Sequence, residues 1–154
     1  MRDALLNSKV RTIASINQRA ISAGALIALA TNTIVMVEGS TIGAATPVLA
    51  GTGGPPTPVD EKSVSYVRNE FRATAEVRKR NPVFAEAMVD SDVEIPKVIA
   101  KGKLLTLTTS GALEHKIADF QAPTLEEALA AAGLPKAEVR RLTETWAESL
   151  VRFI

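Results

Sequence analysis

Residues 20–48 read AISAGALIALATNTIVMVEGSTIGAATPV, and this stretch decides which fold the chain can adopt. Glu38 is its only ionisable side chain. Residues 22–30 are rich in Ala and Leu, which favour a helix, whereas residues 33–37 are mostly β-branched, which favours a strand. Because polar residues interrupt the run and its character changes midway, the pattern predicts a helix followed by a buried strand rather than a membrane-spanning helix.

The whole chain has the composition of a globular domain. Its 154 residues carry 18 Lys and Arg against 17 Asp and Glu, and 46% of them are hydrophobic. The lack of Cys excludes disulfides, thiol nucleophiles and Cys-based zinc sites, and the single His, His115, excludes a His-rich metal cluster. A net charge of +1, with one Trp, one Tyr and four Phe, argues against a nucleic-acid-binding protein.

Helical and strand-like patterns alternate along the chain, which predicts an α/β fold with a largely parallel sheet. The segment 51–58, GTGGPPTP, is expected to be a flexible loop, and Gly43 indicates a close approach of two backbones. We expect one domain over residues 1–154, with residues 121–154 as a C-terminal helical extension. The basic cluster at residues 78–80 is expected to be a solvated helix end. The expected helices are 2–7, 22–30, 60–80, one opened by Asn81-Pro82, 110–115, one from the Thr124–Glu127 capping box to Gly133, and one from Lys136. The expected extended segments are 10–16, 33–37, 42–48 and 103–107. Asn17-Gln18-Arg19 is expected to form a turn.

Ser22 is the first candidate for chemistry. It follows a strand and a short turn, opens a helix and has small neighbours, as does a nucleophilic serine on a strand-to-helix turn. Backbone N–H groups at the start of such a helix can hold an oxyanion. The same position also suits a serine that only caps the helix, since Ser is a favoured N-cap. The residues alone leave both interpretations open.

Lys62 is the second candidate, in the first turn of the helix that Asp60 is expected to cap. The positive end of the helix dipole disfavours a charged lysine there, as burial does, and a neutral lysine can deprotonate a serine. A Ser–Lys pair also suits a chain with a single His. The alternative is an ordinary surface lysine beside Glu61.

The order of these motifs resembles the protease domain of the NfeD family, membrane-bound serine proteases related to ClpP. The resemblance rests on residues 22–48, on the Gly/Pro loop, on EKSVSYVRNEFRATAEVRKRNPVFAEAMVD at residues 61–90 and on GKLLTLTTSGALEHKIAD at residues 102–119. It covers roughly residues 5–154. It implies an α/β protein with the ClpP/crotonase-like fold.

The resemblance also implies an activity and a setting. Ser22 would be the nucleophile, Lys62 the general base, and the backbone N–H of Ala23 one oxyanion donor, with no metal and no cofactor. The implied reaction is cleavage within hydrophobic stretches of a membrane-associated protein, with a stomatin-like protein as substrate and partner. Such enzymes usually form dimers or larger oligomers, so we expect a membrane-associated homo-oligomer at the prokaryotic cell envelope.

The chain departs from the family pattern at both ends. The family's first strands, with a Gly-Gly turn that supplies the second oxyanion donor, would precede residue 1, so we expect a fold incomplete at the N-terminus and weak activity of this chain alone. Transmembrane helices would follow residue 154. His115-Lys116 replaces a more usual Leu-Gly pair, and His115 is expected to be a surface residue at a helix end.

Two other functions stay open at this point. A crotonase-like enzyme would stabilise the thioester enolate of an acyl-CoA and would need an acidic residue, for which residues 20–48 offer only Glu38. A non-catalytic assembly domain of the same fold would need neither Ser22 nor Lys62. A fluorophosphonate probe distinguishes these classes, because only the serine peptidase should react with it.

Overall fold

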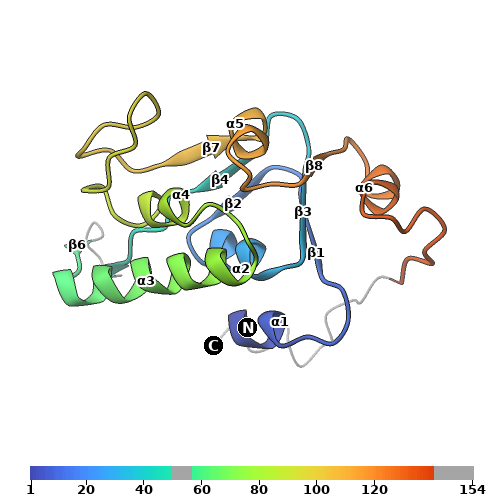
Figure 1. Cartoon of the computed structure of the whole chain (residues 1–154), viewed down its shortest axis with the longest axis horizontal. Helices are drawn as coiled ribbons and strands as arrows, with labels where there is room; N and C mark the ends of the chain where they lie inside the picture. The colour runs from blue at the N-terminus through green and yellow to red at the C-terminus, as the bar shows by residue number, and fades with distance from the viewer. Residues whose placement is uncertain (50–56, 141–154) are drawn as a thin grey trace.

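The computed structural model describes residues 1–49 and 57–140 and has a mixed α/β architecture (Figure 1). Its helices are α1 (Arg2–Leu6), α2 (Ala23–Ala30), α3 (Glu61–Val77), α4 (Pro82–Ala87), α5 (Thr109–Glu114) and α6 (Leu125–Ala131). Its strands are β1 (Ile13–Ile16), β2 (Arg19–Ile21), β3 (Thr33–Met36), β4 (Thr41–Gly43), β5 (Val48–Leu49), β6 (Thr57–Pro58), β7 (Thr106–Thr108) and β8 (Phe120–Gln121).

The two larger sheets have three strands each, and two continuous segments of the chain each contribute one strand to both sheets. In one sheet β3 lies between β1 and β8, and all three strands are parallel. In the other sheet β4 lies between β2 and β7, parallel to β2 and antiparallel to β7. Because β1 runs into β2 and β3 runs into β4, each of these segments passes from one sheet to the other (Figure 1). The prediction of largely parallel pairing is confirmed, with β4–β7 and the short β5–β6 pair antiparallel.

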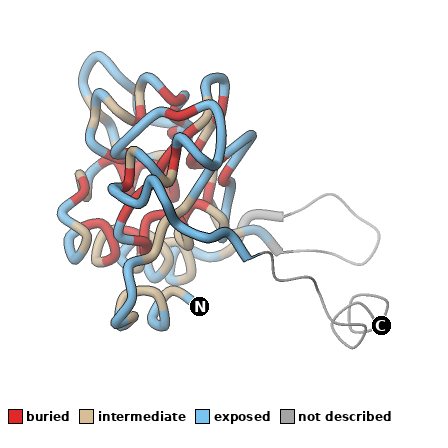
Figure 2. The backbone as a smooth tube through the Cα atoms, turned by 90° about the vertical axis from the view of Figure 1, so that its right-hand side faces the viewer, coloured by how far each residue is buried: buried red, intermediate tan, exposed pale blue. Residues whose placement is uncertain are grey.

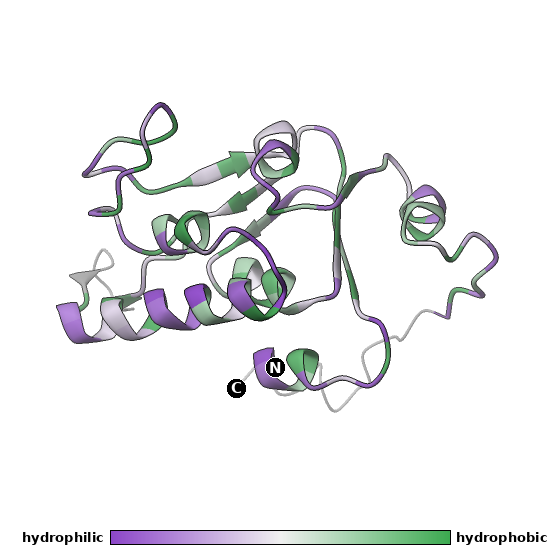
Figure 3. Ribbon diagram, in the orientation of Figure 1, coloured by the Kyte–Doolittle hydropathy of each residue, from purple (hydrophilic) through white to green (hydrophobic). Residues whose placement is uncertain are grey.

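The centre of the fold is the part of the sequence that carries almost no charge. All four residues of β3 are buried, and α2 buries Ala25, Ala28, Leu29 and Ala30. Figure 3 shows hydrophobic colours along α2 and β3, and Figure 2 shows the buried segments gathered in the interior. A helix that is apolar on nearly every side belongs in a core. Over residues 1–49 and 57–140, none of the helices has the length and apolar content of a membrane span.

Helix α3 covers this core with one apolar face. Val64, Val67, Phe71 and Ala75 recur at helical spacing and pack on the core, as predicted, and Phe71 is 2% exposed. The helix packs against α2 and α4 (Figure 1). Removal of a buried Phe typically costs about 3–5 kcal/mol, since the cavity left behind collapses only partly. This face therefore fixes α3, and the backbone of Lys62 with it, against the core.

Local signals set where several helices begin and end. Asp60, Asn81 and Thr124 each accept a backbone N–H from the first turn of α3, α4 and α6, respectively. Gly133 follows α6 with a φ of 81°. A side-chain acceptor satisfies an N–H that the helix leaves unbonded, and glycine adopts the left-handed turn without a Cβ penalty. These predicted boundaries are confirmed.

The shortest elements differ from the sequence-based expectation. Arg19, expected in a turn, begins β2, and β7 begins at Thr106 rather than at Lys103. Strand β8 was not predicted. Strands of two or three residues are too short to show a period of two, so their pairing partners decide them. Residues 136–140 are not helical, and the rest of the expected last helix lies outside the described residues, as does most of the loop at 51–58.

The basic cluster at residues 78–80 is not a fully solvated helix end, contrary to expectation, because only Lys79 of its three residues is exposed. Arg80 is 5% exposed, and its guanidinium nitrogens lie 2.9 Å from the Asp119 carboxylate and 2.8 Å from the Ile117 carbonyl oxygen. Arg78 donates to carbonyl oxygens in α1 and at the end of α2. Helix ends leave carbonyl groups unbonded, and Arg78 bonds two such groups, whereas Arg80 pairs with a carboxylate and a loop carbonyl.

Candidate active site

Ser22 lies in a strained turn between β2 and α2. Its backbone has φ 56° and ψ −126°, in a region that residues other than glycine rarely occupy. The residue is exposed, and although it occupies the N-cap position, its side chain makes no capping hydrogen bond to α2. An ordinary N-cap serine has an extended backbone and accepts an N–H from its own helix. The geometry is instead that of a serine on a sharp strand-to-helix turn.

The backbone N–H of Ser22 is hydrogen-bonded, whereas the N–H groups of the next two residues are not. The Ser22 N–H lies 3.2 Å from the carbonyl oxygen of Gly43 and 3.2 Å from that of Ala44. In the described part of the chain, the N–H groups of Ala23 and Gly24 have no hydrogen-bond acceptor, as is usual at the start of a helix. At the positive end of α2, the Ala23 N–H can therefore donate to an oxyanion, the role predicted for it.

Lys62 is the second residue of α3, and it is exposed. The expected burial of Lys62 is wrong, because the apolar face of α3 turns other side chains to the core. Helices α2 and α3 pack against each other, and Figure 1 shows α3 beginning at the left edge of the molecule, beyond the first turn of α2. This packing does not by itself join the two candidates, because no hydrogen bond links Ser22 and Lys62 among the described residues. Among the described residues, no hydrogen bond or ion pair engages the Lys62 side chain.

Asp60 places a carboxylate at the start of the same helix as Lys62. Hydrogen bonds from Ser63, through its side chain and then its backbone N–H, lower the pKa of Asp60 from its ordinary value of 3.8. The backbone bond is 2.8 Å long. The cap therefore stays ionised at neutral pH and complements the positive end of the helix dipole.

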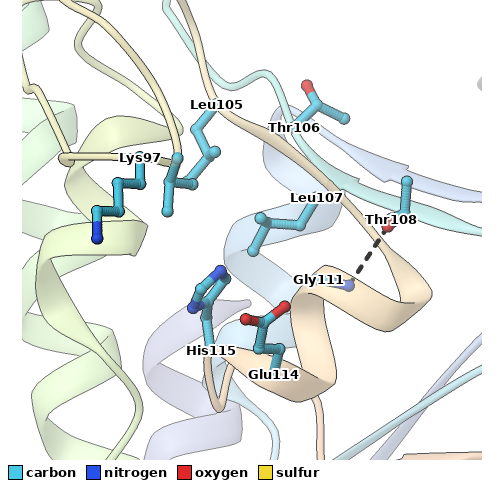
Figure 4. A pocket seen from close by; sticks show the side chains of 9 residues that line it. Lys97, Leu105, Thr106, Leu107, Thr108, Gly111, Glu114 and His115 are labelled. Atoms are coloured by element: carbon cyan, nitrogen blue, oxygen red, sulfur yellow. Dashed lines mark hydrogen bonds between the residues drawn. The ribbon is translucent and has the colours of Figure 1, made fainter.

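A cavity of about 490 Å³ lies beside β7 and α5 (Figure 4). Figure 4 shows the side chains of Lys97, Glu114 and His115 around it. His115 follows α5, as expected at a helix end, but it is half-buried rather than on the surface. Its ring stacks on Phe84 with the centroids 4.3 Å apart. Ser22 and Lys62, the two candidate catalytic residues, do not line this cavity. The cavity is therefore not the candidate active site.

A smaller cavity of about 220 Å³ lies against the helix that Ser22 opens. Gly24, Ile27 and Ala28 of α2 line it together with residues of β1 and β2. The surface is therefore hollowed on the β1–β2 side of α2, and the lining begins at Gly24, in the first turn after the serine. Over residues 1–49 and 57–140, His, Asp and Glu side chains do not gather in groups of three or more that could hold a metal ion.

Gly43 and Ala44 contact Ser22, and sequence reasoning did not predict that contact. The close backbone approach expected at Gly43 is confirmed, because a Cβ there would lie 2.4 Å from the carbonyl oxygen of Leu105. Gly43 has a φ of 140° and Ala44 a φ of 43°. A glycine signals such a conformation, whereas an alanine does not, and the serine that they contact is distant in sequence.

Comparison with known proteins relates the whole chain to one group. The family described as the NfeD1b N-terminal domain matches residues 1–142. The membrane protein NfeD1b of Bacillus subtilis (strain 168) is 34% identical over 155 residues, which is 100% of this chain and 35% of that protein. The chain thus spans about a third of the length of the curated relative that it matches.

Three solved structures share the fold. The 1510-N membrane-bound stomatin-specific protease, as a serine-to-alanine mutant, has a TM-score of 0.71 at 25% identity, over 84% of this chain and 59% of that chain. A lysine-to-alanine mutant of the same protease, in complex with a substrate peptide, has a TM-score of 0.79 at 23% identity, over 99% and 73%. The 1510-N membrane protease specific for a stomatin homologue from Pyrococcus horikoshii has a TM-score of 0.69 at 23% identity, over 99% and 71%. The chain therefore has the ClpP/crotonase-like fold of these proteases.

Proposed function

Since the chain belongs to the NfeD1b N-terminal domain family, we propose that it is a serine endopeptidase domain with Ser22 as nucleophile and Lys62 as general base. The observation that carries this proposal is the backbone of Ser22. Its positive φ and missing capping bond keep the hydroxyl out of the structural role that a serine at this position would otherwise have.

The proposed reaction passes through an acyl-enzyme. The Ser22 Oγ attacks the peptide carbonyl carbon while its proton moves to the Lys62 Nζ, and the Ala23 N–H donates to the resulting oxyanion. The C–N bond then breaks, and Nζ returns the proton to the leaving amine. Water attacks the ester, Lys62 takes a proton from that water and returns it to Oγ, and the carboxyl product leaves.

The general-base role of Lys62 rests on the comparison with the solved mutants. The substitutions in the two solved mutants fall on a serine and a lysine, separated along that chain by nearly the same interval as Ser22 and Lys62. The lysine mutant is the one solved with a substrate peptide. Catalytic hydrogen bonds often tighten only when substrate is present, so an exposed Lys62 in the free chain is compatible with this role.

The proposed substrate is a hydrophobic stretch of a stomatin-like membrane protein. This follows the specificity of the solved protease, which is specific for a stomatin homologue. We extend the proposal to membrane association, since the curated relative is a membrane protein of which this chain spans a part, and the homo-oligomer implied by the family resemblance stays a prediction.

A fluorophosphonate probe tests the proposed function directly. The chain should be labelled once, at Ser22, and Ser22→Ala should abolish the labelling. Ser110→Ala is the matched control, because Ser110 is also an exposed serine in the first turn of a helix. Unlabelled wild-type protein would instead favour a non-catalytic assembly domain, and labelling that survives in Ser22→Ala would move the nucleophile elsewhere.

A further inference from the structure

We propose that Gly43 and Ala44 are positioning residues that hold Ser22 in its reactive conformation and keep it from capping its own helix. This inference rests on the proposed function for its catalytic meaning, but the contacts that support it are independent of that function. Neither residue is proposed to touch the substrate.

Three unusual backbone conformations meet at one point. Ser22, Gly43 and Ala44 have φ angles of 56°, 140° and 43°. The Ser22 N–H bridges the carbonyl oxygens of the other two residues, at 3.2 Å from each. A strained residue persists only where its surroundings over-determine it. For Ser22, the carbonyl groups of Gly43 and Ala44 are the contacts that hold the strained conformation.

Gly43 can occupy this place only without a side chain. A Cβ would lie 2.4 Å from the Leu105 carbonyl oxygen and 2.9 Å from the Cα of Thr106, both backbone atoms. The same Leu105 carbonyl accepts the Ala44 N–H at 3.1 Å. Gly43 pairs with Thr106 in the antiparallel ladder of β4 and β7. A side chain at residue 43 would therefore push these two strands apart and move the carbonyl groups that hold Ser22.

The strand behind Gly43 cannot yield easily. The Leu105 N–H donates to the Ala87 carbonyl at 2.9 Å, and the Ala45 N–H donates to the Met88 carbonyl at 2.7 Å. Leu105, Ala87 and Met88 are all buried. Both sides of the contact are thus hydrogen-bonded to the end of α4. The buried core, rather than a surface loop, therefore fixes the position of Ser22.

If the hydrogen bonds to the Gly43 and Ala44 carbonyl groups are lost, Ser22 can adopt the ordinary N-cap conformation instead. A serine before a helix ordinarily adopts an extended backbone, and its oxygen accepts an N–H of the first turn. In that state Oγ is hydrogen-bonded to α2 and turned away from substrate. The Gly43–Ala44 pair therefore decides between a capping and a nucleophilic serine.

The test compares Gly43→Ala with Gly39→Ala and Gly102→Ala. Gly39 and Gly102 also have positive φ, 79° and 84°, but a Cβ at either would meet nothing within 4 Å. All three variants strain the backbone, most severely at Gly43, where a φ of 140° lies far from the left-handed region that alanine tolerates, and only Gly43→Ala displaces the contact with Ser22. Two quantities are measured for the folded fraction of each protein: the rate of fluorophosphonate labelling and the hydrogen-exchange rate of the Ser22 amide.

Gly43→Ala should be labelled about 100-fold more slowly, since misplacing a reacting group by about 1 Å costs roughly that factor. Its Ser22 amide should exchange faster, whereas both controls should match the wild type. Wild-type labelling and exchange in folded Gly43→Ala would overturn the proposal. A purely structural role would lower thermal stability in all three variants and leave the labelling of folded protein unchanged.

A measurement on the unmodified chain covers the case in which Gly43→Ala does not fold. The wild-type Ser22 amide should exchange more slowly than those of Ala23 and Gly24, which have no acceptor among the described residues. Equal exchange at the three amides would overturn the proposal. If wild-type Ser22 proves unreactive to the probe, the proposed function fails while the exchange data still decide whether Gly43 and Ala44 hold the serine.

Discussion

The carboxylate of Asp119 lies 2.9 Å from the buried guanidinium of Arg80, and the same carboxylate oxygen accepts the Ile34 N–H at 2.7 Å. One side chain thus ties the end of α3 to the start of β3. Asp119→Ala should lower the free energy of unfolding by about 3 kcal/mol, because it leaves the Arg80 charge buried without its partner.

Urea denaturation measures this effect, with Asp92→Ala as control. Asp92 pairs with Lys101 at 3.8 Å, and both side chains are largely exposed, so its loss should cost about 0–1 kcal/mol. Equal destabilisation by the two variants would contradict the role assigned to Asp119.

Ser22 should trade stability for reactivity. Ser22→Gly should raise the free energy of unfolding by about 1 kcal/mol, since glycine occupies positive φ without strain, and should abolish hydrolysis of a hydrophobic peptide. Ser22→Ala should also be inactive but keep wild-type stability, because alanine bears the same strain. Urea unfolding beside a peptidase assay measures both effects. A Ser22→Gly variant less stable than Ser22→Ala would show that the turn is not strained.

Lys62→Arg should be as inactive as Lys62→Ala. Arginine keeps the charge and the approximate length but does not release its proton, so it cannot act as a base. Lys97→Arg, another exposed lysine, should leave the rate of peptide hydrolysis unchanged. Retention of most activity by Lys62→Arg would reduce Lys62 to a residue that only binds or orients the substrate.

The cap of α3 should weaken in acid. The pKa of Asp60 is lower in the folded chain than its ordinary value of 3.8, so the carboxylate stabilises the fold at pH values above 3.8. That contribution is lost as the pH falls below 3.8 and through the folded pKa. Asp60→Asn keeps a capping acceptor but removes the titration. Urea midpoints between pH 2 and 6 should therefore show a smaller acid dependence for Asp60→Asn than for the wild type, and identical curves would exclude this role.

Three helices end in the same left-handed turn with different residues. Lys79 follows α3 with φ 57°, Lys116 follows α5 with φ 58°, and Gly133 follows α6 with φ 81°. Lys79→Gly and Lys116→Gly should each stabilise the chain by about 0.5–1 kcal/mol, whereas Gly133→Ala should destabilise it by a similar amount. Thermal unfolding ranks the three variants. Loss of stability in both lysine variants would mean that their side chains have a compensating role.

The sequence predicts best those structural features that depend on residues close together in the chain. Asp60, Asn81 and Thr124 are caps whose partners lie within a turn, and the uncharged run predicts α2 and β3 without knowledge of the rest of the fold. The ClpP/crotonase-like fold came from a resemblance carried by several motifs together.

What the sequence could not predict depends on contacts between distant residues. Arg80 looks like part of a surface cluster until Asp119 is placed beside it. The positive φ of Ser22 has no local cause, because two carbonyl groups from another strand impose it. Likewise, β8 is a strand only through its pairing with β3.

The passage of two segments between the sheets has a consequence for how the chain unfolds. Because β1 continues into β2 and β3 into β4 through the short connections 17–18 and 37–40, the two parallel pairs are coupled to each other. We expect the opening of one pair to strain the other, so the two sheets should behave as one cooperative unit in native-state hydrogen exchange. The turn at the end of β2 would then open only with the whole domain. A serine held in this way is protected from local fluctuation by the full stability of the fold.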